Sequence, residues 1–258
     1  GSGDIGLIMA RRMTLEGAEV KAVAEVMPYS GGLKRNIVQC LDDFDIPLYL
    51  STTVVEIHGQ EHLTGVTLAQ VDDRRLPVAG TERYIPCDTL LLSVGLLPEN
   101  ELTRQAGAAL DAVTGGPAVD ETLATSLPGV FACGNVLHVH DLVDFVSQEA
   151  AAAGRSAARY VLEGVKDSES IRLEGKNGVR YTVPQTLHRG GAPVTVRFRV
   201  GQPYRNAALC AYAGSTLLKR ISKRILTPGE MESFPLDPAA IPADADTVTF
   251  VVEEAQAQ

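Results

Sequence analysis

Three glycines at the start of the chain have the spacing that brings a backbone close to a diphosphate. Gly1, Gly3 and Gly6 form a G-x-G-x-x-G, and a helical pattern follows. A strand pattern over 19–26 comes next, and its acid Glu25 stands 19 residues beyond Gly6. A dinucleotide fold places a pyrophosphate at such a helix N-terminus and a ribose hydroxyl on such a carboxylate. The spacing therefore predicts a dinucleotide site; the alternative is a helix-capping turn beside a surface glutamate.

Glu25 also bears on which nicotinamide cofactor would fit. Its carboxylate would repel the 2′-phosphate of NADP(H), and no Arg occurs in the next eight residues to receive that phosphate. We therefore expect NAD(H) rather than NADP(H).

A second group of chemically capable residues lies between positions 133 and 141. Gly134 and Asn135 are followed by His138 and His140, and then by an Ala-rich helical pattern over 142–162. An imidazole on such a loop could act as general acid or base, or bind an anionic substrate. It could equally be a structural loop residue, or half of a His-x-His metal pair, for which the sequence shows no third ligand at a suitable spacing. We take His138 and His140 as the candidate catalytic residues and predict no metal site.

The elements that must position these residues alternate between helix and strand up to residue 164. We predict an amphipathic helix over 31–45, a strand near 47–50, an antiparallel meander over 52–58, 65–72 and 83–85, and a buried strand over 87–95. A glycine fingerprint normally follows a buried strand, and this sequence begins at the first glycine. We therefore expect the first strand of the nucleotide sheet to lie outside the sequence.

The charge balance and the spacing of Pro and Gly residues both change near residue 165. Acids are in excess before it, whereas the residues after it are slightly basic. The polar stretch 166–178 is interpreted as a linker, and the short β-type runs that follow are spaced as in a small β-sandwich. The predicted fold class is α/β: a Rossmann-like domain over 1–115 that lacks its first strand, part of a second nucleotide-binding domain over 116–165, and a sandwich-like all-β domain over 179–258.

Composition narrows the class of protein. The formal net charge of -9 disfavours a nucleic-acid partner, whose phosphates require a basic face. Four widely spaced cysteines without a CxxC pair indicate a reducing, cytoplasmic compartment and no local redox disulfide. No apolar run approaches the roughly 20 residues of a membrane span. The basic cluster at 219–224 is interpreted as a solvated strand face rather than a phosphate site.

The order of these motifs resembles one family. The glycine fingerprint, the acid at a strand end, D-T-L-L-L-S-V-G-L-L-P-E-N at 88–100 and G-V-F-A-C-G-N at 129–135 are arranged as in the pyridine nucleotide–disulfide oxidoreductase superfamily. In that family an NAD(P)H domain is inserted into an FAD domain. The resemblance covers about residues 1–165 and is nearest to the branch without a redox CxxC, the flavoprotein subunits of anaerobic glycerol-phosphate and amino-acid dehydrogenases. It implies that the N-terminal FAD half is absent from this sequence.

The resemblance also assigns cofactor residues. NAD(H) would be held by Gly1, Gly3, Asp4, Ile5, Gly6 and Glu25, Gly95 would mark the crossover between domains, and FAD would be held by Gly134, Asn135, Phe145 and Val146. The family's ribitol-binding acid is replaced here by Asn135, whose amide can still hydrogen-bond a hydroxyl. Segment 116–165 becomes the C-terminal part of an FAD-binding domain. The helix that begins near 144 would direct its N-terminal dipole at the isoalloxazine ring, with His138 and His140 on the loop beside it.

The implied function is an FAD-dependent oxidoreductase, or the flavoprotein subunit of one, that exchanges hydride between NAD(H) and flavin. A small-molecule substrate and a protein partner or further subunit would complete it. The alternatives are an NAD-only dehydrogenase that uses His138 or His140 as base, and a non-catalytic binding or scaffold chain. Because the glycine turn for the FAD pyrophosphate would precede Gly1, we also expect this chain alone to hold FAD weakly.

Overall fold

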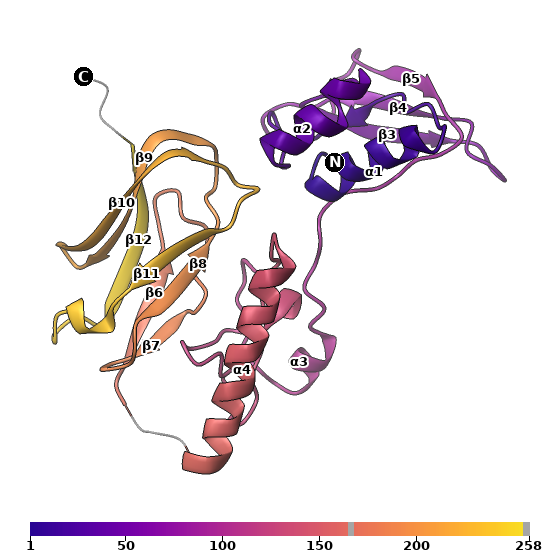
Figure 1. Ribbon diagram of the computed structural model, residues 1–258. Coiled ribbons are helices and arrows are strands. Elements are labelled where there is room, and N and C mark those ends of the chain that lie inside the picture. Colours follow the sequence, from indigo (N-terminus) through magenta and orange to yellow (C-terminus); the bar gives the residue numbers. More distant parts are fainter. Residues whose placement is uncertain (165–167, 255–258) are drawn as a thin grey trace. The chain divides into compact units, whose positions relative to one another are not determined.

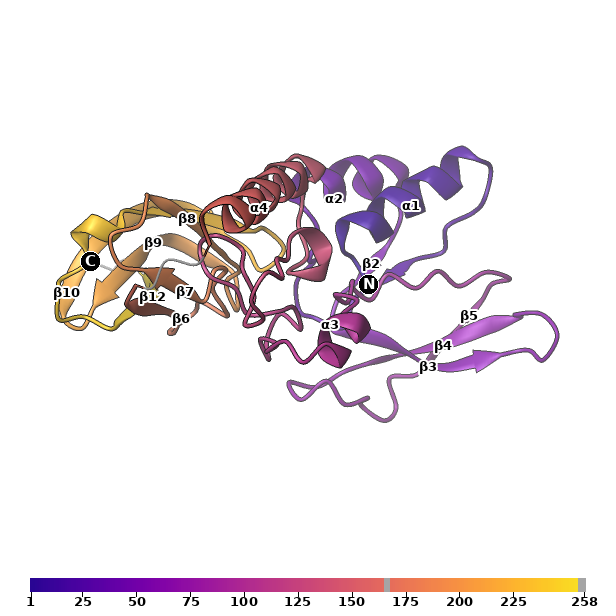
Figure 2. The same ribbon diagram turned by 90° about the horizontal axis from the view of Figure 1, so that it is seen from below.

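Residues 1–164 and 168–254 are described by the computed structural model, and the chain divides into two units, Gly1–Gly95 and Leu96–Gln258. Figures 1 and 2 show the elements of each unit from two directions. The sequence analysis placed the first boundary at 115, whereas residues 96–115 cluster with the second unit. Asn100 explains part of this difference, because its side-chain amide donates to the carbonyl oxygens of Gly115 and Val136.

The first unit combines a helix pair, a short parallel strand pair and a meander. Its elements are α1 (Asp4–Leu15), β1 (Val23–Ala24), α2 (Lys34–Cys40), the 3-10 turn η1 (Asp42–Phe44), β2 (Leu48–Tyr49), β3 (Thr52–His58), β4 (Gly65–Gln70) and β5 (Arg83–Pro86). The core between α1, α2 and β1 consists of Leu7, Ala10, Val23, Cys40, Leu41 and Ile46. The helix predicted over 31–45 is shorter than expected, because Leu33 has extended dihedral angles and only Lys34–Cys40 is α-helical.

Pairing in the first unit confirms the meander and corrects one strand. β3, β4 and β5 are antiparallel neighbours in that order, and β1 pairs in parallel with β2. The prediction of a buried strand over 87–95 is wrong: the structure assigns no strand there, and Leu91, Leu92 and Val94 are 53%, 73% and 82% exposed. An apolar run becomes a buried strand only where neighbouring strands take up its backbone hydrogen bonds, and no described strand does so here.

The second unit begins with a loop-rich segment that ends in one long helix. Its helices are α3 (Glu101–Gln105), the 3-10 turn η2 (Gly134–Val136) and α4 (Val143–Glu163), and α4 agrees with the helix predicted over 142–162. The core here consists of Val119, Leu123, Ala132, Leu137, Ala153, Tyr181 and Val183. Tyr181 and Val183 come from the part predicted as a separate β domain, so the two parts share a core.

Two β-sheets complete the second unit. Their elements are β6 (Ser170–Gly175), β7 (Thr186–His188), β8 (Val194–Phe198), β9 (Tyr204–Ala213), β10 (Thr216–Leu226), β11 (Glu232–Leu236), the 3-10 turn η3 (Pro238–Ala240) and β12 (Thr247–Glu254). One sheet has the order β10-β9-β12-β6-β7, and β11 pairs with β8 in the other. Phe198, Phe234 and Phe250 bring both sheets into one core. We call this part the β sandwich, defined as residues 170–254.

The β sandwich begins earlier than predicted. β6 lies inside the stretch 166–178 that the sequence analysis interpreted as a linker, because alternate side chains, Ile171 and Leu173, are buried beneath a polar exterior. Residues 165–167 of that stretch lie outside the described residues.

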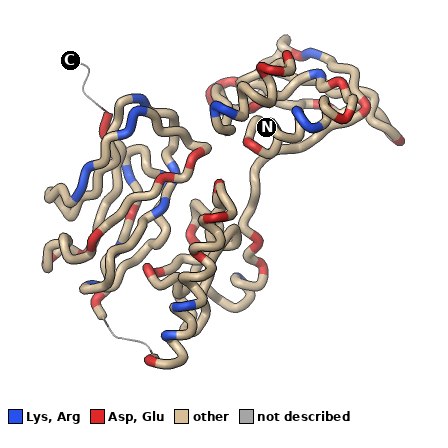
Figure 3. The backbone as a smooth tube through the Cα atoms, viewed as in Figure 1, with Lys and Arg blue, Asp and Glu red and all other residues tan. Residues whose placement is uncertain are grey.

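Several positions along β10 are Lys or Arg, coloured blue on the backbone tube of Figure 3. Within this cluster Arg220 pairs with Glu253, and Lys223 Nζ lies 2.6 Å from Glu232 Oε2. These pairs within the β sandwich support the interpretation of 219–224 as a solvated strand face. Among the described residues, no helix has both the length and the apolar character that crossing a bilayer requires.

Candidate functional site

The three glycines of the fingerprint differ in what surrounds them. A Cβ on Gly1 would lie 1.7 Å from the Ser93 carbonyl oxygen, and one on Gly6 would lie 2.7 Å from Ser93 Oγ and 2.8 Å from the Gly1 carbonyl oxygen. These two positions therefore require glycine for packing within the protein. A Cβ on Gly3 would meet no atom within 4 Å. Gly3 thus borders open space, which a ligand that approaches the backbone would occupy.

That open space lies at the N-terminal end of α1. Gly3 is the N-cap residue of this 12-residue helix, and no side chain caps the helix there. The N–H groups of the first turn are therefore available to an anion, which the helix dipole also favours. The Asp4 carboxylate is engaged within the protein, since its Oδ1 accepts hydrogen bonds from Leu33 N at 2.8 Å and Asn36 Nδ2 at 2.7 Å. Ile5 is 61% exposed.

Glu25 follows β1 directly and is only 8% exposed. Its Oε2 accepts hydrogen bonds from Ser2 N and Ser2 Oγ, both at 2.7 Å, and its Oε1 accepts one from Met27 N at 3.0 Å. The Ser30 hydroxyl donates to the Ser2 carbonyl oxygen at 3.0 Å. Glu25 therefore fixes the glycine loop, a structural role that the sequence did not reveal.

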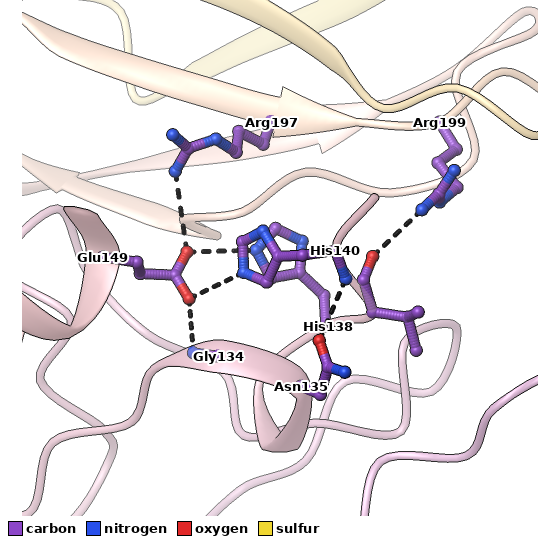
Figure 4. A network of polar contacts seen from close by, with 8 residues as sticks. Gly134, Asn135, His138, His140, Glu149, Arg197 and Arg199 are labelled. Atoms are coloured by element: carbon purple, nitrogen blue, oxygen red, sulfur yellow. Dashed lines mark hydrogen bonds and ion pairs between the residues drawn. The ribbon is translucent and has the colours of Figure 1, made fainter. Parts of the chain in front are cut away.

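In the second unit, one buried carboxylate accepts hydrogen bonds from three donors and forms an ion pair with an arginine (Figure 4). Glu149 of α4 accepts on Oε1 from His138 Nε2 at 3.1 Å and on Oε2 from His140 Nε2 at 2.9 Å. Gly134 N also donates to Oε2, at 2.6 Å, and Arg197 Nη1 lies 3.6 Å from Oε1. The side chains of both histidines are 1% exposed, and that of Glu149 is 3% exposed. The structure thus brings the two predicted histidines together around a residue that the sequence analysis did not name.

Burial and hydrogen bonding oppose each other at Glu149. Burial alone would raise the pKa of its carboxyl, but hydrogen bonds from His138, His140 and the Gly134 amide outweigh it and lower the pKa to about 2. Burial also lowers the pKa of His138 below its usual value. The cluster at neutral pH is therefore a carboxylate that accepts hydrogen bonds from a neutral His138.

Both histidines are placed to hold the Glu149 carboxylate rather than to transfer protons to or from a ligand. Each has its Nε2 on Glu149, and both Nδ1 atoms are buried without a partner among the described residues. A general acid or base must reach the proton that it transfers, and neither ring reaches solvent here. In this arrangement His138 and His140 orient the Glu149 carboxylate.

Two asparagine side chains hold the loop that contains the histidines. Asn135 Oδ1 accepts a hydrogen bond from the His140 backbone amide at 3.1 Å, and Asn100 Nδ2 donates to the Val136 carbonyl oxygen at 2.7 Å. The side-chain oxygen of Asn135 is thus used within the protein, whereas its NH₂ group is the part suited to a ligand hydroxyl or carbonyl.

Gly134 and the start of α4 lie together, as the resemblance implies. Gly134 has φ +72°, and a Cβ there would lie 3.3 Å from Val146 Cγ1. The Arg197 guanidinium lies 5.2 Å from the ring centroid of Phe145. Leu142 is the N-cap residue of α4 and provides no side-chain cap. The first turn of this helix therefore also has N–H groups available to an acceptor.

The family description "Pyridine nucleotide-disulphide oxidoreductase" matches residues 1–157, which include both glycine loops. The chain belongs to this family.

Individual proteins are similar to this chain over part of their length. The thioredoxin reductase of Listeria monocytogenes is 32% identical over 129 residues, which are 49% of this chain and 37% of that protein. The NADP(+)-dependent formate dehydrogenase subunit beta of Moorella thermoacetica is 38% identical over 137 residues, 49% of this chain and 19% of that protein. The solved thioredoxin reductase of T. acidophilum has a TM-score of 0.55 and 28% identity, and the match covers 63% of this chain and 51% of that one. The chain thus spans about half, or less, of the proteins that it matches.

The sequence did not reveal that Asn100, Glu149 and Arg197 belong to this site. Asn100 closes the L-L-P-E-N stretch that carried part of the resemblance, so its motif was visible although its contact was not. Glu149 stands in an Ala-rich helix, where a lone acid resembles a solvated position; only its four-residue spacing from the buried Ala153 places it on an inward face. Arg197 lies 48 residues beyond Glu149 and had no local signal.

The lowered pKa of Glu149 predicts that acid destabilises the second unit. A carboxyl with a depressed folded pKa contributes stability above its unfolded pKa, and this is lost as pH falls from its usual 4.5 towards about 2. His138 acts in the same direction because its lowered pKa favours the neutral form, so protonation below its usual 6.5 favours unfolding. Urea unfolding should show the free energy of unfolding falling by about 2 kcal/mol between roughly pH 6 and 3. Glu149→Gln should make this decline shallower, and an unchanged decline in the variant would contradict the assignment.

Proposed function

We propose that the protein is an FAD-dependent oxidoreductase, or the flavoprotein subunit of one, that exchanges hydride between NAD(H) and flavin. The observation that carries this proposal is the open space beside Gly3, at the uncapped N-terminus of α1, in a loop whose preceding residue, Ser2, donates to the Glu25 carboxylate. The family to which the chain belongs uses FAD and NAD(P)H, in agreement with the cofactors predicted from the sequence. A small-molecule substrate and a protein partner or further subunit are part of the proposal.

The residues of the first unit fit a dinucleotide. The first-turn N–H groups of α1 would donate to the pyrophosphate, and the absence of a side chain at Gly3 would let it approach the backbone. Gly1 and Gly6 hold the loop against Ser93. The Glu25 carboxylate accepts three hydrogen bonds from the protein and has lone-pair capacity left for a ribose hydroxyl.

The residues around Gly134 fit one end of a flavin. The uncapped N-terminus of the 21-residue α4 offers N–H groups and a positive dipole end to the ring, which suits negative charge on a reduced flavin. The Asn135 NH₂ group would donate to a ribitol hydroxyl, while its Oδ1 holds the His140 amide. FAD, when bound, supplies the hydride-accepting chemistry, and the protein supplies position and electrostatic field. Gly95 ends the first unit with φ +102°, at the crossover implied by the resemblance.

NADH should bind more tightly than NADPH, and Glu25→Ala should narrow the preference. A ribose hydroxyl that donates to a charged acceptor contributes about 1.5–3 kcal/mol, which is roughly tenfold or more in the dissociation constant. Fluorescence titration with each nucleotide measures the ratio. Glu19→Ala is the matched control, because Glu19 lies in the same segment with a 79% exposed side chain paired to Lys21. Equal or tighter NADPH binding by the unmodified protein would contradict the proposal.

Two rival functions make different predictions for the same sample. A non-catalytic scaffold chain and an NAD-only dehydrogenase would both lack the flavin absorption bands in the full-length protein. NADH binding then separates these two from each other. Flavin bands together with saturable NADH binding would support the proposed function against both.

A further inference from the structure

The loop from Gly134 to Asp141 is held by three different parts of the second unit. α4 holds it through Glu149, which accepts the Gly134 amide, and the segment before α3 holds it through Asn100. The β sandwich provides the third attachment, directly through Arg199 and indirectly through Arg197, which pairs with Glu149 (Figure 4). No motif in the sequence pointed to this attachment.

Arg197 supplies the positive charge at the Glu149 cluster. Its Nη1 lies 3.6 Å from Glu149 Oε1, and its guanidinium lies over the ring of Phe145 at 5.2 Å. The Arg197 side chain is 16% exposed. Because a buried carboxylate is costly without a compensating charge, the Arg197 guanidinium is the positive partner that this ion pair provides for Glu149, which accepts the Gly134 amide.

Arg199 holds the other end of the loop. Its Nη2 donates to the Val139 carbonyl oxygen at 3.0 Å and to Asp141 Oδ1 at 2.5 Å, while its Nη1 donates to the Gly229 carbonyl oxygen at 2.6 Å. Asp141 Oδ2 accepts the Met231 amide at 2.6 Å. The turn between β10 and β11 is thereby joined to the same loop.

We propose that the β sandwich is a working part of the flavin site: Arg197 and Arg199 are positioning residues that keep the loop from Gly134 to Asp141 in its ligand-binding shape, Arg197 through Glu149 and Arg199 through Val139 and Asp141. This rests on the proposed function, in which the loop contacts FAD. The contacts of Arg199 with this loop and of Arg197 with Glu149 give the β sandwich a role in the site.

A divalent cation is the rival explanation of the cluster. His138, His140 and Glu149 each offer a ligand atom, and these atoms lie within 4.8 Å of one another. Three features favour a hydrogen-bonded cluster instead. The Gly134 amide already donates to Glu149, and the Arg197 guanidinium would face any cation bound there. In addition, metal-bound histidines usually donate their second ring nitrogen to a partner, and both Nδ1 atoms here have none among the described residues.

Hydrogen exchange of the 258-residue chain without flavin tests the attachment. In Arg197→Met and Arg199→Met, amides of residues 134–141 should exchange about tenfold faster, whereas those of β9 should keep their rates. Arg220→Met is the matched control, because Arg220 pairs with Glu253 within the β sandwich and does not contact the loop. Unchanged loop exchange overturns the proposal. So does equally faster exchange throughout the second unit, since that result indicates a general structural role.

FAD affinity of the full-length protein, measured by quenching of flavin fluorescence, tests the link to the ligand. Both Met variants should bind FAD about tenfold more weakly, with Arg197→Lys between Arg197→Met and the unmodified protein, and Arg220→Met should be unaffected. Faster loop exchange with unchanged FAD affinity overturns the role in flavin binding. If the unmodified protein binds no FAD, the proposed function fails, while the exchange result still decides the attachment. Stoichiometric metal that is lost in His138→Ala would replace this account with the cation site.

Discussion

Alanine at position 149 should lower the free energy of unfolding of the second unit by about 3–5 kcal/mol, the range for removing one partner from a buried ionic cluster. Glu149 accepts hydrogen bonds from His138, His140 and Gly134, and it lies near the Arg197 guanidinium. Its removal leaves the two buried histidines and the Gly134 amide without an acceptor, and the partly buried Arg197 charge without its partner. Urea unfolding followed by circular dichroism measures the loss.

Two further variants serve as comparisons for Glu149→Ala. Glu121→Ala removes another glutamate that accepts from a histidine, His188 Nδ1 at 3.1 Å, but the His188 side chain is 34% exposed. Water can replace that partner, so the loss should be below about 1 kcal/mol. Glu149→Gln keeps the shape and one acceptor oxygen and should fall between the two. Equal losses for Glu149→Ala and Glu121→Ala would show that the buried cluster is not a centre of stability.

Gly3→Ala should weaken NADH binding by about a hundredfold, because the methyl group would occupy the space for the pyrophosphate and two charge-assisted hydrogen bonds would be lost. The fold should be unaffected. Gly3 has φ −66° and ψ 164°, which any residue adopts, and its Cβ would meet no atom within 4 Å. Titration calorimetry and thermal unfolding of the same sample separate binding from stability.

Gly6→Ala is the contrasting variant. Its Cβ would lie 2.8 Å from the Gly1 carbonyl oxygen and 2.7 Å from Ser93 Oγ, so it should lower the melting temperature as well as the affinity. If Gly3→Ala bound NADH like the unmodified protein, the open space at α1 would not be the pyrophosphate site.

The sequence predicted those features that depend on local periodicity and short motifs. α1, α4 and the meander follow from helical and alternating patterns, and the glycine loop with Glu25 follows from a spacing that one βαβ unit determines. The start of α4 at Val143 was likewise visible, because an amphipathic run marks it.

The features that it missed depend on contacts between distant segments. The run 87–95 has the composition of a buried strand, but a strand is buried only where other elements cover it. No described strand pairs with this run, and Leu92 is 73% exposed. Glu149 and Arg197 meet only once α4 and β8 are in place. The contacts of His138 and His140 could not be predicted for the same reason, since their partner Glu149 comes from another element.

Anaerobic mixing of NADH with the FAD-loaded full-length protein tests the proposed hydride exchange most directly. Flavin absorbance at its long-wavelength band should disappear in a single turnover, with half-saturation at a lower concentration of NADH than of NADPH. Gly3→Ala should slow this reduction at subsaturating NADH and leave the reduction by dithionite unchanged. A flavin that dithionite bleaches but NADH leaves oxidised would contradict the account.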